Sequence, residues 1–136
     1  MAEQTTPMTQ GLVPYINPSD AAAAAEFYKT AFAATDVVPM LADDGKRYMH
    51  CSMTINGSQL YMSDSFPEYG VPFVPPQGFN LNLNVDDAQF WWDRAVGAGC
   101  TVTMPLEKQF WGDIYGQLKD PFGVTWAIGQ SVKPAD

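Results

Sequence analysis

One succession of elements occurs twice along this sequence, and this repeat constrains the fold more than any other feature. In the first half, an apolar run at residues 12–17 precedes an Ala-rich segment with helical spacing at 21–34, and three further apolar runs follow. In the second half, a run at residues 79–85 precedes a helical segment that ends at Ala98, and three short runs follow again. Random β-rich sequences rarely repeat an element order in this way. The sequence therefore predicts two βαβββ modules in a domain of the α+β class.

The boundaries of the expected elements follow from this repeat. Asp20 and Asp86 are N-cap residue types at the starts of the two helices, and Gly99 fits the position after the second helix. The remaining strands are expected at residues 37–42, 47–55, 58–63, 101–104, 113–119 and 124–129. The expected plan is a flexible N-terminal tail (1–11), a single domain (12–130) with modules at 12–66 and 79–130 joined by a loop at 67–78, and a C-terminal tail (131–136).

The connection between the modules is unusual in composition. It carries Pro67, Pro72, Pro75 and Pro76 among aromatic residues. Prolines exclude a helix there, and the segment is longer than a usual connection. Such a loop is typical of a lid or of a segment at an interface.

Composition excludes several classes of function. The chain has 136 residues, of which 46% are hydrophobic, and this fits one globular domain with a substantial core. The net charge of −8, without a Lys/Arg cluster, argues against nucleic acid and anionic membranes as partners. No segment resembles a signal peptide or a membrane span, so a cytoplasmic location is expected. The two cysteines, Cys51 and Cys100, do not suggest a disulfide framework.

The dipeptide Asn56-Gly57 sorts the side chains of one hairpin onto two faces. A two-residue turn pairs Ile55 with Ser58, and the side chains then alternate between the faces of the sheet. The apolar face consists of Cys51, Met53, Ile55, Leu60 and Met62. The polar face consists of His50, Ser52, Thr54, Gln59, Tyr61 and Ser63.

The second module repeats this division. The apolar positions are Leu81, Leu83, Val85, Leu118, Val124, Trp126 and Ile128, and the opposite positions are Asn80, Asn82, Asn84, Gln117, Lys119, Thr125 and Ala127. The apolar faces must pack on the helices. The polar faces are rich in amides and hydroxyls, whereas a solvated face usually recruits Lys and Glu. This composition favours a ligand-facing cleft over a face that merely meets water.

Several short motifs resemble those of a known family. They are Pro14-Tyr15-Ile16-Asn17, Glu26-Phe27-Tyr28-Lys29, Met49-His50-Cys51, Met62-Ser63-Asp64, Met104-Pro105-Leu106, Phe110-Trp111-Gly112-Asp113-Ile114-Tyr115-Gly116 and Lys119-Asp120-Pro121-Phe122-Gly123. With these motifs the chain, from about residue 12 to residue 128, resembles the PhnB-like branch of the vicinal oxygen chelate (glyoxalase/bleomycin resistance/dioxygenase) superfamily.

The resemblance implies that the two modules form one cupped mixed sheet with the helices on its convex side, commonly in a homodimer. Metal-dependent members of the superfamily place one metal ligand on each of four strands. Carried over by spacing, these positions fall on Val13, Tyr61, Asn80 and Ala127. Val and Ala cannot bind a metal ion, and neutral Tyr and Asn are poor ligands. We therefore expect no metal and no other cofactor.

The candidate ligand-binding residues are Tyr15, His50, Gln59, Tyr61, Asn80, Asn82, Trp111 and Gln117. His50 is the one catalytic candidate, as a general base, and the favoured alternative is a structural hydrogen bond to Ser63 or to a backbone carbonyl. Trp111 either forms a wall of the pocket or anchors its loop in the core. Cys51, on the apolar face, is expected to be a packing residue and not a nucleophile.

Three functions are compatible with these residues. The first is a metal-free, homodimeric protein that binds a small molecule in the cleft, where the amides favour a neutral polar ligand. The second is a metal-dependent lyase or dioxygenase whose ligands lie at other positions. The third is an enzyme that uses His50 without a metal.

Overall fold

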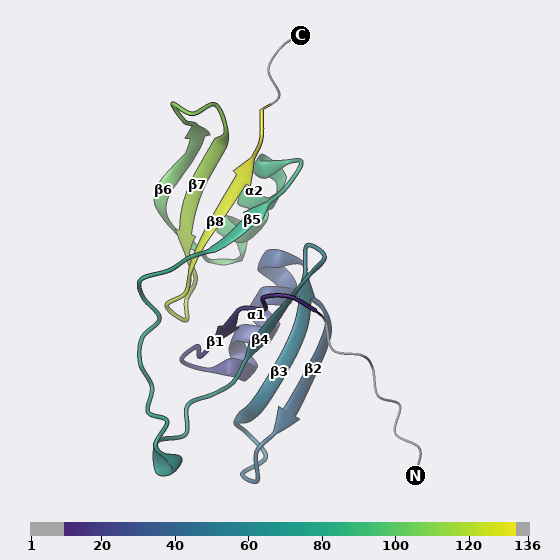
Figure 1. The fold of residues 1–136 in the computed structure, drawn as a ribbon, viewed down its shortest axis with the longest axis vertical. Helices are drawn as coiled ribbons and strands as arrows, with labels where there is room; N and C mark the ends of the chain where they lie inside the picture. The colour runs from purple at the N-terminus through teal and green to yellow at the C-terminus, as the bar shows by residue number, and fades with distance from the viewer. Residues whose placement is uncertain (1–9, 133–136) are drawn as a thin grey trace.

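The structure, a computed structural model, describes residues 10–132 (Figure 1). In chain order its elements are β1 (Tyr15–Ile16), α1 (Ala21–Phe32), β2 (Thr35–Leu41), β3 (Tyr48–Ile55), β4 (Ser58–Met62), the 3-10 turn η1 (Pro67–Tyr69), β5 (Leu81–Asn84), α2 (Ala88–Ala98), β6 (Thr101–Lys108), β7 (Ile114–Lys119) and β8 (Thr125–Gln130). The predicted βαβββ order therefore occurs twice. Neither helix of residues 10–132 is long and apolar enough to cross a membrane. Most of the two predicted tails, residues 1–9 and 133–136, lies outside the described residues.

Each module builds its own four-stranded sheet. The strand orders are β1-β4-β3-β2 and β5-β8-β7-β6. In both sheets the first strand of the module pairs in parallel with the last, and the other pairs are antiparallel. The α+β class and the paired βαβββ modules are confirmed. The mixed sheet is divided into two halves that are not hydrogen-bonded as one continuous sheet within residues 10–132.

The turn between β3 and β4 fixes the register of the first sheet. Asn56 and Gly57 both have positive φ, 49° and 81°. A two-residue turn of type I′ requires this backbone, which Asn and Gly adopt more readily than other residues. The predicted pairing of Ile55 with Ser58, and of the residues that follow along both strands, is confirmed.

The two helices begin in the same way. Asp20 accepts the N–H of Ala23 at 3.1 Å, and Asp87 accepts the N–H of Phe90 at 3.1 Å. These carboxylates satisfy backbone donors that have no partner inside the helix. The predicted cap Asp86 is one residue too early, because two adjacent aspartates have the same capping chemistry and only the backbone path distinguishes them.

The last strand of each module also reaches the start of its own helix. Asp64, after β4, accepts the N–H of Ala21 at 2.8 Å, and Gln130, at the end of β8, accepts the N–H of Ala88 at 2.8 Å. In each module, a side chain at the end of the last strand therefore accepts a hydrogen bond from the first residue of the helix, although this side chain is an Asp in one module and a Gln in the other.

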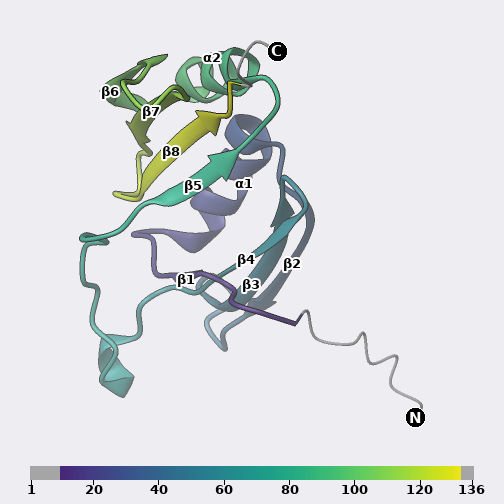
Figure 2. The same ribbon diagram turned by 45° about the horizontal axis from the view of Figure 1, so that its top comes forward.

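The common core lies between the two sheets. Helix α1 packs on its own sheet and also on Trp126 of the other sheet, where the Phe32 and Trp126 rings are stacked with centroids 4.0 Å apart. Figure 2 shows α1 between the strands of the first sheet and strands β5 and β8. Helix α2 lies beside α1, and Arg94 donates to the carbonyl of Thr30 at 2.7 Å. The apolar faces of both sheets therefore point toward one shared helical layer.

A buried carboxylate joins the modules. Asp120 is 5% exposed, and its Oδ2 accepts from Tyr28 Oη at 2.6 Å and from Trp126 Nε1 at 2.9 Å. Its Oδ1 accepts the N–H groups of Phe122 at 2.9 Å and Val124 at 3.0 Å. Burial, together with the charge of Asp120, raises the pKa of Tyr28 well above its ordinary value, so its hydroxyl stays protonated and donates. The motif that begins at Asp120 is a structural junction between α1 and β8.

Strand β6 is longer than predicted. The sequence predicted a strand at 101–104 and a loop from residue 105, whereas the strand continues through Pro105 to Lys108. β6 is an edge strand, and a proline is tolerated there because its missing N–H is not needed by a neighbour. Pro39 occupies β2, the edge strand of the first sheet. Prolines on both outer edges oppose the addition of further strands.

Gly116 in β7 is required by packing. A Cβ atom at this position would lie 2.7 Å from Trp92 Cζ3 and 2.8 Å from Leu106 Cα. Trp92 is buried against this glycine, and Trp91 is only half-buried. The glycine therefore lets a bulky helix residue approach the sheet backbone.

The loop between the modules is held by one arginine. Arg47 forms ion pairs with Asp44 and Glu68, and its guanidinium lies 4.4 Å from the centre of the Phe66 ring. Phe66 also pairs with Val71 in an isolated β-bridge. The loop contains only the three-residue turn η1 (Pro67–Tyr69), in agreement with the prediction that its prolines exclude a helix.

Candidate functional site

We call the face of each sheet that points away from the helices its outer face. The side-chain sorting predicted for the first hairpin is confirmed, since its five apolar-face residues are at most 4% exposed. The residues on the outer face are partly exposed; they are His50, Ser52, Thr54, Gln59 and Tyr61. Ser63 is an exception, because it is buried and its hydroxyl accepts from Asn17 Nδ2 at 2.9 Å.

Three ring side chains form a cluster on the first outer face. Tyr15 of β1 lies beside Tyr61 of β4, and His50 comes from the next strand, β3. The ring centroids are 5.0 Å apart for His50 and Tyr61, 5.7 Å for Tyr15 and His50, and 6.3 Å for the two tyrosines. All three pairs are edge-to-face, which is a favoured aromatic arrangement. The hydroxyl of Ser63, the expected partner of His50, is bound by Asn17 instead, and the imidazole packs against the tyrosines.

Two apolar side chains extend this outer face along the edge strand. Val38 pairs with Ser52 and Met40 pairs with His50, so both point to the same side as the ring cluster. They are 61% and 58% exposed. Sequence reasoning missed them because the turn between β2 and β3 did not fix a register. The alternation of apolar residues along β2 was the available signal.

The second outer face carries a separate aromatic group. Trp111, in the turn between β6 and β7, lies 5.9 Å from Tyr115, ring centre to ring centre. Gln117 donates to Tyr115 Oη at 3.1 Å and pairs across the sheet with Met104. Trp111 is 49% exposed, so it does not anchor its loop in the core.

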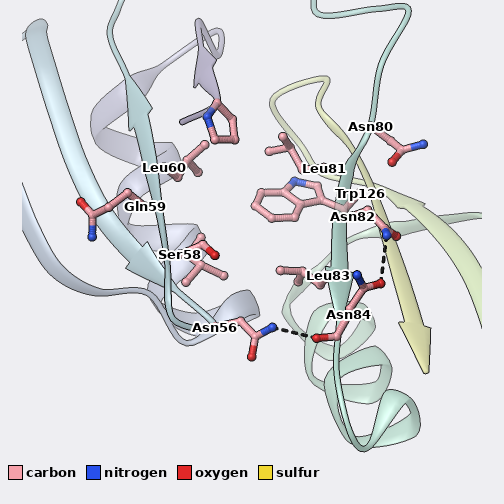
Figure 3. A pocket seen from close by; sticks show the side chains of 12 residues that line it. Asn56, Ser58, Gln59, Leu60, Asn80, Leu81, Asn82, Leu83, Asn84 and Trp126 are labelled. Atoms are coloured by element: carbon pink, nitrogen blue, oxygen red, sulfur yellow. Dashed lines mark hydrogen bonds between the residues drawn. The ribbon is translucent and has the colours of Figure 1, made fainter. Parts of the chain in front are cut away.

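The eight predicted binding residues do not surround one cleft within a single chain. In Figure 3, Gln59 on β4 points away from β5, while Asn80 and Asn82 on β5 point to the opposite side. Tyr15, His50 and Tyr61 belong to the first outer face with Gln59, and Gln117 belongs to the second with Asn80 and Asn82. Because both apolar faces turn inward to the helices, the two outer faces lie on opposite sides of the helical layer.

Strand register shows which residues lie beside two of the positions that the resemblance relates to metal ligands. Tyr15 is level with Tyr61, and Asn82 is level with Ala127. The expected positions Val13 and Asn80 lie two residues before Tyr15 and Asn82 and therefore on the same sides, since side chains alternate.

The donor set at the four expected positions, Val13, Tyr61, Asn80 and Ala127, does not fit a metal ion. It consists of one phenol, one amide and two aliphatic side chains, where Zn²⁺ or Fe²⁺ would need imidazole or carboxylate. Nowhere in residues 10–132 do three or more His, Cys, Asp or Glu side chains gather as a group that could hold a metal.

The cysteines are packing residues. Burial raises the pKa of Cys51 above its ordinary value. Burial and the nearby charge of Asp120 raise the pKa of Cys100 to about 12. Both side chains are therefore neutral thiols near pH 7, whereas a cysteine nucleophile must be a thiolate. The prediction that Cys51 serves packing is in agreement with its complete burial.

Comparison of the sequence with known proteins identifies relatives along nearly its whole length. The family model of the Glyoxalase/Bleomycin resistance protein/Dioxygenase superfamily matches residues 11–128. An uncharacterized protein of Mycobacterium bovis is 37% identical over 128 residues, which cover 90% of this chain and 84% of that protein.

Solved structures share the fold. The protein PA1353 from Pseudomonas aeruginosa is 27% identical, with a TM-score of 0.70 over 90% of this chain and 98% of that one. The PhnB protein from Bacillus cereus is 19% identical, with a TM-score of 0.65 over 90% of this chain and 100% of that one. The second likeness concerns the fold alone.

Proposed function

This chain belongs to the glyoxalase/bleomycin resistance protein/dioxygenase superfamily, and from that premise we propose that it binds a small, neutral, partly aromatic molecule without using a metal ion. The observation that carries the proposal is the cluster of Tyr15, His50 and Tyr61 on the first outer face. Tyr61 is also one of the positions that the resemblance to the superfamily relates to a metal ligand, and Tyr15 lies beside it.

Aromatic rings at this site supply contact area together with hydrogen-bonding groups. Two phenol hydroxyls and one imidazole can donate to or accept from a ligand, while the ring surfaces bury apolar area. Tyr15 is 50% exposed, so much of its surface is available for contact. Such a combination fits a flat ligand with a few polar groups, which is the usual chemistry of small-molecule sites.

The charge pattern favours a neutral ligand. No Asp, Glu, Lys or Arg is among the residues that β3 and β4 direct to the first outer face, His50, Ser52, Thr54, Gln59 and Tyr61. A strong anion would lack a cationic partner there, and the net charge of −8 would repel it.

We further propose that the complete cleft forms between two copies of the chain. In a single chain, the ring cluster and Trp111 lie on different outer faces. A symmetric homodimer could place the first outer face of each protomer against the second outer face of its partner. Each of its two clefts would then combine the ring cluster of one protomer with Trp111 of the other. The exposed apolar residues on both faces support such a contact, in particular Val38, Met40 and Met104.

We expect light scattering to give the mass of a dimer, with more than about 1,000 Å² buried in total. Replacing Met40 by Glu should weaken the dimer, because it places a charge in an apolar contact. Gln89→Glu, on the exposed side of α2, is the matched control and should leave the dimer intact. A monomer at high micromolar concentration would contradict the assembly.

We expect the protein, after treatment with EDTA, to be stabilised against heat by some members of a panel of neutral aromatic compounds. A ligand that binds only the native state must raise its stability. The matching aromatic carboxylates should have little effect, because the site lacks a cation. Tyr61→Ala should remove the stabilisation by removing one ring of the cluster. Differential scanning fluorimetry measures all of these shifts.

Metal analysis provides the decisive control for this proposal. Elemental analysis of the purified protein should find no stoichiometric Zn, Ni, Fe or Mn, and added ions should not raise the melting temperature. One tightly bound ion per chain that is lost in His50→Ala would contradict the proposal that the protein binds its ligand without a metal ion. It would favour a metal-dependent enzyme instead.

A further inference from the structure

A pocket of about 390 Å³ lies at the seam between the two modules, separate from the ring cluster. Its apolar wall comes from both modules, with Leu60 on β4, Leu81 and Leu83 on β5, and Trp126 on β8. Figure 3 shows these side chains directed toward one another across the gap between β4 and β5. The volume falls within the usual range for small-molecule sites.

The edge of β4 presents backbone groups to this gap. The N–H of Tyr61 donates to the carbonyl of Pro14, so on this strand the backbone of Tyr61 faces away from β3. Residues two apart on a strand direct their backbone groups to the same side. The N–H and C=O of Gln59 therefore face the seam, and β1, which starts at Tyr15, does not extend far enough to pair with them.

The edge of β5 presents the same kind of groups from the other side. The backbone N–H of Val85 donates to the carbonyl of Gly129 on β8, so the backbone groups of Leu83 and Leu81 also face β8. The backbone groups of Asn80, Asn82 and Asn84 face the opposite edge of the strand. The carbonyl of Asn84 accepts from Asn56 Nδ2 at 3.0 Å, which closes one end of the gap (Figure 3). The backbone groups of Asn82 remain directed at the seam.

We propose that the seam pocket is a second binding site, for a small neutral molecule that joins an apolar body to a secondary amide or a similar donor–acceptor pair. The apolar body would contact the leucines and Trp126, and the amide would pair with the free backbone groups of Gln59 or Asn82. An N–H and a C=O on one strand edge match an amide in the same way that they match another strand. None of the twelve residues that line the pocket is charged, so an ionic ligand has no partner there.

N-Methylbenzamide is a suitable test molecule, because it carries one aromatic ring and one secondary amide. Titration into isotope-labelled protein, followed by NMR, should shift the methyl signals of Leu60, Leu81 and Leu83 and the backbone amide signals of Gln59 and Asn82. Ser58 lines the pocket and is exposed, so Ser58→Phe should fill the pocket without disturbing the core. We expect this variant to bind at least about tenfold more weakly.

Ser52→Phe is the matched control. It makes the same change on β3, where the partly exposed side chain lies on the first outer face and is not among the twelve residues that line the pocket. Binding at the seam should persist in this variant, and also in Tyr15→Ala, which alters only the ring cluster.

Three results would overturn the second site. They are an absence of shifts up to the solubility limit of the compound, shifts centred on Tyr15, His50 and Tyr61, and unchanged binding in Ser58→Phe. Shifts centred on the ring cluster would at the same time support the proposal for the outer faces, which is tested separately by Tyr61→Ala and by metal content.

Discussion

Replacing Asp120 by Asn is expected to lower the free energy of unfolding by roughly 2–5 kcal/mol, since two buried donors lose their acceptor. The carboxylate accepts two hydrogen bonds on each oxygen. An amide keeps the shape but replaces one oxygen by an NH₂ group, which only donates. Either Tyr28 and Trp126, or the backbone N–H groups of Phe122 and Val124, would then face another donor. Urea denaturation at one fixed protein concentration measures the change.

Two further variants test whether the loss of stability comes from the hydrogen bonds that Asp120 accepts at the junction between α1 and β8. Asp43→Asn, on the exposed turn after β2, makes the same chemical change and should leave stability within about 0.5 kcal/mol of the wild type. Tyr28→Phe removes a single donor from Asp120 and should have a smaller effect than Asp120→Asn, with the two effects coupled in a double-mutant cycle. If Asp120→Asn is as stable as the Asp43 control, the carboxylate does not hold the modules together.

Replacing Leu83 by Asn is expected to lower the free energy of unfolding by about 3–5 kcal/mol. Leu83 is 8% exposed in the shared core, so the change removes apolar contacts and buries an amide without partners. Asn80→Leu, three positions earlier on the opposite side of the chain, should change stability by less than about 1 kcal/mol. The melting temperatures of the two variants give the comparison and require no knowledge of a ligand.

This pair of variants tests the assignment of faces that underlies both proposed sites. Leu83→Ala separates the two contributions, because it removes the same contacts without adding a polar group. The reverse pattern, with Asn80→Leu unfolding the protein and Leu83→Asn neutral, would show that the outer and inner faces of the second sheet have been exchanged.

Local sequence signals determined much of this structure. Asn56 and Gly57 fixed the turn and thereby the register of β3 and β4, because few other residue pairs adopt positive φ twice in succession. The alternation of Leu and Asn in residues 80–84 identified the buried side of β5, since side chains in a strand alternate with a period of two. The βαβββ repeat indicated the fold, and the short motifs carried the resemblance to the superfamily whose model matches residues 11–128.

Features that no single local signal decides were misplaced or missed. The cap of α2 was displaced by one residue, because Asp86 and Asp87 are chemically equal. Val38 and Met40 were not recognised as outer-face residues, because their side depends on pairing with β3 and not on a turn signal. The role of Asp120 was not visible, since its partner Tyr28 lies 92 positions earlier in the chain.

By itself the sequence determined which sides of β3, β4, β5, β7 and β8 are buried, and that His50 and Tyr61 belong to the opposite side. Only the tertiary structure decided where those sides lie in relation to one another. Helix α1 packs on both sheets, with Phe32 stacked on Trp126, so both apolar faces turn inward and the two outer faces turn apart. The physical reason is that strand periodicity is a local property of the backbone, whereas the orientation of one sheet against the other depends on contacts between residues far apart in the sequence.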